Sequence, residues 1–193
     1  MSVLCIDTSS RRRVVALLAT RGGVVETSDV RLDISVGIGL PLALDGLIDA
    51  DVEAIVVVLG PGSYTGLRAG MAAALGIAHA RALPLHGVAT LDAVAAGWAA
   101  GNEQSGVVAV DAGRGAVYAA DCSPVKGRWE PGPPRRMALT ALLLVRGPVA
   151  STDDLPVPGL VRVDPASALA ASVPRAFESA PLPSSGLAAT YVG

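Results

Sequence analysis

Short apolar runs separated by polar turns fill the first third of the chain. Residues 2–10 form an apolar run that ends in Asp and hydroxyl side chains, and runs at 11–20 and 24–32 follow. This spacing predicts three consecutive strands joined by tight turns. The continuous β-branched run at 53–60 predicts a further strand, buried on both faces.

Helical periodicity appears at three places in the first hundred residues. Leucine and isoleucine at helical spacing predict a helix within 40–50. The segment GLRAGMAAALGIAHARAL predicts a long helix over 66–83 that Pro84 stops. A short strand is expected at 85–90, and a further helix at 91–100.

A strand that ends in Asp and a small-residue turn occurs twice. VVAVDAGRGAVYAADC repeats the opening theme, and it places Asp111 where Asp7 stands in the first copy. The polar segment 101–106 separates the copies. We therefore expect an α/β fold of two duplicated lobes, at 1–100 and 107–193, with the second lobe smaller.

The pattern weakens after residue 120. Helices are expected at 138–144 and 164–172, and strands at 148–152 and 159–163. The segment 125–137 contains three prolines and is predicted to be a loop.

Composition narrows the range of functions. Aromatic residues are only 3% of the chain, so the core must be aliphatic, and the net charge is −2 without a basic stripe. This balance argues against tight, direct binding of a nucleic-acid backbone, which depends on neutralising phosphates. Cys5 and Cys122 form no C-x-x-C pair, so we expect no metal or redox site and a reduced, cytoplasmic chain. No signal peptide or membrane span is expected.

The stretch GPGSYTGLRAG at residues 60–70 is the most unusual local feature. It contains no Lys for a phosphate-binding P-loop, and Thr65 stands where G-x-G-x-x-G needs its third glycine. A tight turn, or an anion site at the helix start, remains possible from the residues alone. Gly66 and Gly70 lie on one helical face, where small residues let another helix approach closely. That helix could belong to this chain or to another subunit.

The two Asp turns are the main candidates for chemistry. Asp7 and Asp111 could hold a metal and nucleotide phosphates across a cleft, but Asp is also a common turn residue. His79 and His86 are seven residues apart with a proline between them, so they do not form a metal pair. No Ser, His and Asp arrangement stands out.

Three stretches together resemble the TsaB (YeaZ) family: VLCIDTSSRRRVVALL, GPGSYTGLRAG followed by GVATLDA, and VVAVDAGRGAVYAA. The resemblance covers about the first 120 residues. It implies an actin-like ATPase (ASKHA or RNase H-like) fold in two lobes, and membership of the glycoprotease-like M22 superfamily. It implies a cytoplasmic, non-catalytic partner of TsaD, acting with the ATP-dependent TsaE in threonylcarbamoyladenosine formation at tRNA position 37. A homodimer is expected when TsaD is absent.

The resemblance and the helical face together predict a partner interface, which would comprise Pro61, Gly62, Ser63, Tyr64, Thr65, Gly66, Arg68, Ala69, Gly70, Ala73 and Ile77. No catalytic residue and no metal ligand is assigned. No firmly bound cofactor is expected, and a site for ATP or ADP with Mg²⁺ would involve Asp7, Thr8, Ser9 and Asp111. The alternative function is an ATP-binding phosphotransferase or ATPase of the actin-like superfamily.

Overall fold

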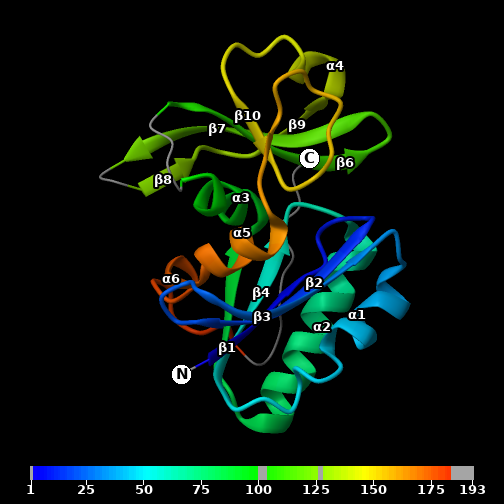
Figure 1. Cartoon of the computed structure of the whole chain (residues 1–193), viewed down its shortest axis with the longest axis vertical. Coiled ribbons are helices and arrows are strands. Elements are labelled where there is room, and N and C mark those ends of the chain that lie inside the picture. Colours follow the sequence, from blue (N-terminus) through cyan, green and yellow to red (C-terminus); the bar gives the residue numbers. More distant parts are fainter. Residues whose placement is uncertain (1, 100–103, 126–127, 184–193) are drawn as a thin grey trace.

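Two mixed sheets, each centred on a strand that ends in an Asp turn, form the framework of the protein. The structure is a computed structural model that describes residues 2–99, 104–125 and 128–183 (Figure 1). The predicted link at 101–106 and the C-terminal residues from 184 onward therefore lie partly or wholly outside the described residues.

The first sheet has the strand order β3-β2-β1-β4-β5. The first three strands are antiparallel neighbours, while β4 and β5 join in parallel. Its strands are β1 (Ser2–Asp7), β2 (Arg13–Thr20), β3 (Val25–Leu32), β4 (Val52–Gly60) and β5 (Leu85–Ala89). Four of them fall within the predicted runs, and β4 begins one residue before its run, at Val52.

The second sheet repeats this topology, with the order β11-β10-β6-β7-β8, and β9 also pairs with β7. The strands β6 and β7 pair antiparallel, while β10 pairs in parallel with β6 and with β11. Its strands are β6 (Gly106–Gly113), β7 (Ala116–Val125), β8 (Arg128–Pro131), β9 (Arg135–Ala138), β10 (Val149–Ser151) and β11 (Val161–Arg162). The repeated order confirms the predicted α/β class and the two-lobed actin-like arrangement.

The second lobe is the shorter copy. β10 and β11 have three and two residues, where β4 and β5 have nine and five. The helix α4 (Leu139–Leu142) has four residues. The predicted loop at 125–137 is wrong, because β8 and β9 both pair with β7 there. Pro131 ends β8, and Pro133 and Pro134 lie in the turn between the strands, so the prolines interrupt the pairing without preventing it.

Helices α1 and α2 cover one side of the first sheet, and α5 and α6 lie on the other side (Figure 1). The bounds are α1 (Val36–Leu44), α2 (Tyr64–Arg81), α3 (Thr90–Trp98), α5 (Pro165–Ala171) and α6 (Val173–Ala176). The helix predicted within 40–50 begins earlier and carries Pro41 in its interior. The sequence pattern did not predict its first turn, because Gly37 and Gly39 lie there and glycine is a poor helix former.

Three helices pack against the lobe opposite to the one in which the sequence predicted them. Leu169 of α5 and Val173 of α6 belong to the core of the first sheet, although residues 107–193 were expected in the second lobe. Leu91 and Trp98 of α3 belong to a core under the second sheet. The boundaries themselves stay a prediction. No helix in the described part of the chain is long and apolar enough to cross a membrane.

Candidate functional site

The first Asp turn is buried, and it is held by a hydrogen bond within the turn. Asp7 ends β1, and its Oδ1 accepts a hydrogen bond from the Ser9 N–H at 2.8 Å. Thr8 and Ser9 are 1% and 4% exposed. The Ser9 carbonyl accepts from the Ser63 N–H at 2.7 Å, so the turn is fastened to the start of α2.

The glycines of the 60–70 stretch let α2 lie directly on this turn. A Cβ atom on Gly62 would stand 2.5 Å from the Ser9 carbonyl oxygen, and one on Gly66 or Gly70 would overlap Thr8. The Thr8 hydroxyl donates to the Gly66 carbonyl at 2.8 Å. Within this structure, the glycine face is therefore packed against its own chain.

The residues predicted as a partner interface divide between two sides of α2. Pro61, Gly66 and Gly70 are buried inside the lobe, and Ile77 is also buried, at 8% exposed. The exposed members are Tyr64, Thr65 and Arg68, while Gly62, Ser63, Ala69 and Ala73 are half-buried. Ser63 caps the helix, because its Oγ accepts from the Gly66 N–H at 3.3 Å.

The second Asp turn is also engaged internally. Asp111 lies near the end of β6, and its Oδ1 accepts from the Gly113 N–H at 2.9 Å. Its own N–H donates to Asp153 Oδ2 at 2.8 Å. Asp153 follows β10, so this contact joins the ends of two neighbouring strands of the second sheet.

A buried arginine lies between the two lobes. Arg13, the first residue of β2, is 6% exposed. Its Nη1 donates to Asp153 Oδ1 at 2.9 Å and to the Thr152 carbonyl at 2.7 Å, while its Nη2 donates to Thr152 Oγ1 at 3.2 Å. The same Nη2 lies 3.8 Å from Asp7 Oδ2. Arg13 therefore links the first Asp turn to the loop after β10.

A cleft of about 760 Å³ opens beside this arginine, between the lobes. Asp111, Arg13 and Asp153 line it, and the ion pairs Arg12–Asp33 and Arg162–Asp154 stand at it. Of the four residues predicted for a nucleotide, Asp111 is among the lining residues, whereas Asp7, Thr8 and Ser9 are not.

Sequence reasoning missed Arg13 and Asp153. The signal for Arg13 is its place as the first residue of an otherwise apolar run, where a charged side chain enters a buried strand. Asp153 follows the strand within PVAST, so it repeats the Asp-after-strand pattern of Asp7 and Asp111. Both patterns are short, and neither specifies a partner across the lobes.

The histidines and cysteines lie apart from the cleft. His79 is exposed on α2, and His86 is buried in β5. Burial raises the pKa of the Cys122 thiol to about 11, with a smaller contribution from the Asp92 charge, and burial also raises the pKa of Cys5. Among the described residues, no group of three or more His, Cys, Asp or Glu side chains is placed to hold a metal ion.

Comparison with known proteins connects this architecture to a family. The family model for TsaD, tRNA N6-adenosine threonylcarbamoyltransferase, matches residues 43–137. An uncharacterized protein of Mycobacterium tuberculosis is 36% identical over 126 residues, covering 61% of this chain and 57% of that protein. The tRNA threonylcarbamoyladenosine biosynthesis protein TsaB of Bacillus subtilis is 34% identical over 126 residues, covering 61% and 53%. The chain thus matches little more than half the length of these curated relatives.

The solved structure of YeaZ from Pseudomonas aeruginosa has the same fold. It superposes with a TM-score of 0.70 at 20% sequence identity, covering 99% of both chains. This coverage includes both sheets of the chain. The similarity to TsaB over 61% of the chain and the fold shared with YeaZ show that this chain resembles the TsaB (YeaZ) family.

Proposed function

We propose that this protein is a non-catalytic subunit that binds a TsaD enzyme and supports threonylcarbamoylation of adenosine 37 in tRNA. The observation that carries the proposal is the similarity to TsaB of Bacillus subtilis, whose name assigns it to threonylcarbamoyladenosine biosynthesis. The proposal includes a cytoplasmic location, TsaE as a further partner, and self-association when TsaD is absent.

The surface that suits such a partner lies on α1 and α2, which run side by side over the first sheet (Figure 1). On α1, Ile38 and Leu42 are 60% and 44% exposed. On the outward side of α2, Tyr64 is 58% exposed and the small residues Ala72 and Gly76 face solvent. Exposed apolar side chains next to small residues favour close packing against another protein's helix.

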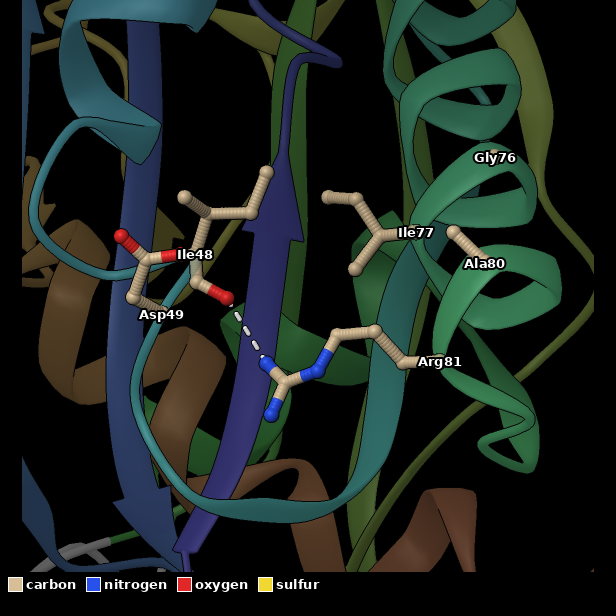
Figure 2. Close-up of a pocket in the computed structure, with 6 residues that line it drawn as sticks. All are labelled: Ile48, Asp49, Gly76, Ile77, Ala80 and Arg81. Atoms are coloured by element: carbon tan, nitrogen blue, oxygen red, sulfur yellow. Dashed lines mark hydrogen bonds between the residues drawn. The ribbon is translucent and has the colours of Figure 1, made fainter.

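A groove continues this surface at the C-terminal end of α2. Figure 2 shows Ile48 and Ile77 facing each other across it, with Gly76 and Ala80 along the helix. Its volume is about 590 Å³. Arg81 fixes the loop that forms the other side, because it donates to the Ile48 carbonyl at 2.7 Å and to the Ala50 carbonyl at 2.9 Å. We assign this groove and the outward side of α2 to the proposed interface, in place of the buried Gly66 and Gly70.

The alternative function, an ATP-binding phosphotransferase or ATPase, has less support from the geometry. An enzyme of that kind needs its Asp carboxylates directed at a metal or at phosphates. Here the carboxylates of Asp7 and Asp111 accept hydrogen bonds from their own turns. Arg13 and Asp153, which line the cleft, are already paired with each other.

The experiment is a binding measurement with TsaD from the same organism. Ala72→Arg places a long charged side chain at the centre of the exposed side of α2 without disturbing the core. Such overpacking costs about 1–3 kcal/mol, which weakens binding about 5- to 150-fold. Isothermal titration calorimetry or sedimentation would measure this change, and a reconstituted modification assay should lose activity in parallel.

Ser167→Arg provides the matched control. Ser167 is exposed on α5, across the first sheet from α1 and α2, so this variant should bind TsaD as the wild type does. Equal binding by Ala72→Arg and wild type would show that this surface is not the interface. No binding of TsaD by the wild-type chain would contradict the proposed function itself.

A further inference from the structure

A single guanidinium connects carboxylates that belong to different lobes. Arg13 reaches Asp153 at 2.9 Å in the second lobe and approaches Asp7 to 3.8 Å in the first. The side chains of all three residues are nearly buried, at 6% exposed for Arg13 and 11% for each Asp. Salt screens such a buried group much less than a surface ion pair.

The contacts of Asp153 extend this link to the second Asp turn. One of its oxygens accepts from Arg13, and the other accepts from the Asp111 N–H at 2.8 Å. The Asp153 N–H in turn donates to Ser151 Oγ at 3.0 Å. Arg13, Asp153 and Asp111 therefore form one connected network across the cleft.

A magnesium nucleotide, which the actin-like fold implies, does not fit these residues. Phosphate binding at such turns depends on free backbone N–H groups. The Ser9 and Gly113 N–H groups instead donate to the Asp carboxylates of their own turns, and the Asp111 N–H donates to Asp153. The Arg13 guanidinium already places a positive charge beside the carboxylates of Asp7 and Asp153.

We infer that Arg13 is a fixed internal cation that holds the two lobes closed, and that the cleft needs and accepts no magnesium nucleotide. This role goes beyond the proposed partner function and does not depend on it. A lobe arrangement held by a side chain stays the same whatever the nucleotide concentration.

Hydrogen exchange on the full-length protein tests the network directly. Arg13→Met keeps much of the side-chain volume but removes the charge and every donor. We expect the Asp111 and Asp153 amides, which take part in the network, to exchange at least tenfold faster in Arg13→Met than in wild type. Arg12→Met is the matched control, because Arg12 pairs with Asp33 at the surface, where the two side chains are 80% and 66% exposed. Its exchange at those two amides should equal that of wild type.

Two results would overturn the inference. The first is a folded Arg13→Met protein whose Asp111 and Asp153 amides exchange at the wild-type rate. The second does not use Arg13→Met, so it holds even if that variant does not fold. In a thermal unfolding titration with millimolar MgATP we expect no change in Tm, and a rise in Tm that Asp111→Asn abolishes would show that the cleft accepts nucleotide. Asp153→Asn, which keeps the shape of the side chain, should raise exchange at the Asp111 amide as Arg13→Met does.

Discussion

His86 is the one buried histidine, and its surroundings favour the neutral ring. It is 5% exposed, its Nδ1 has no hydrogen-bond partner, and its ring lies 4.3 Å from the Phe177 ring. Burial lowers the pKa of His86, and the nearby charge of Arg21 lowers it slightly further. The carbonyl groups of Ala176 and Ser179 act in the opposite direction without reversing the shift. Protonation of His86 therefore opposes the packing of the α6 segment on β5.

The first prediction concerns stability against pH. Because the folded pKa lies below the unfolded value of about 6.5, the unfolded chain binds the proton more readily. The stabilising contribution of neutral His86 is complete above that value, and it is lost as the pH falls below it. The free energy of urea unfolding should decrease between pH 7.5 and pH 5, with at most about 1.4 kcal/mol per pH unit from this group.

Two variants isolate the contribution of His86, because the chain has only two histidines. His86→Gln should flatten the pH dependence in this range, whereas exposed His79→Gln should leave it unchanged. If wild type and His86→Gln lost stability in parallel as the pH fell, another group would be responsible.

At the scale of elements, α2 shows how far the sequence could predict the structure. Its length and its small-residue face are readable from GPGSYTGLRAG and the apolar repeat that follows. The partner of the glycine face was not readable, because Thr8 lies about sixty positions away and a small-residue face suits an internal or an external helix equally. Arg13 was missed for the same reason, since its partners Thr152 and Asp153 are far along the chain.

The second prediction compares two glycines on this one helix. A Cβ on Gly70 would overlap the Thr8 hydroxyl, whereas a Cβ on Gly76 meets nothing within 4 Å. Gly70→Ala should therefore lower the free energy of unfolding by about 1–3 kcal/mol. Gly76→Ala should raise it by about 0.5–1 kcal/mol, because alanine loses less backbone entropy in a helix. Chemical denaturation of both variants gives the two signs, and a stabilised Gly70→Ala protein would mean that Thr8 can move aside.

At the scale of the whole molecule, the duplicated Asp motif predicted two lobes, but it did not predict how they are joined. The helix α5 follows the last strand of the second sheet and packs on the first, with Leu169 in the first core and Ala168 in the second. α3 follows the last strand of the first sheet and packs under the second, where Gly97 approaches Val163 and Ala168 closely. Local patterns specify elements, whereas this exchange of helices depends on contacts between segments that are distant in sequence.

We expect the exchanged helices to make the two lobes unfold as one unit, and the tryptophans allow a test. Trp98 and Trp129 pack against each other at 4.5 Å in the core under the second sheet, so their fluorescence reports on that lobe. Leu169 is 1% exposed in the core of the first sheet. Leu169→Ala should cost about 2–5 kcal/mol of unfolding free energy, and it should lower the denaturation midpoint equally by fluorescence and by circular dichroism.

Leu142→Ala, on the far side of the second sheet, should behave in the same way if unfolding is cooperative. A Leu169→Ala protein whose fluorescence midpoint stays at the wild-type value while its circular dichroism midpoint falls would show that the lobes unfold separately, and that α5 does not couple them.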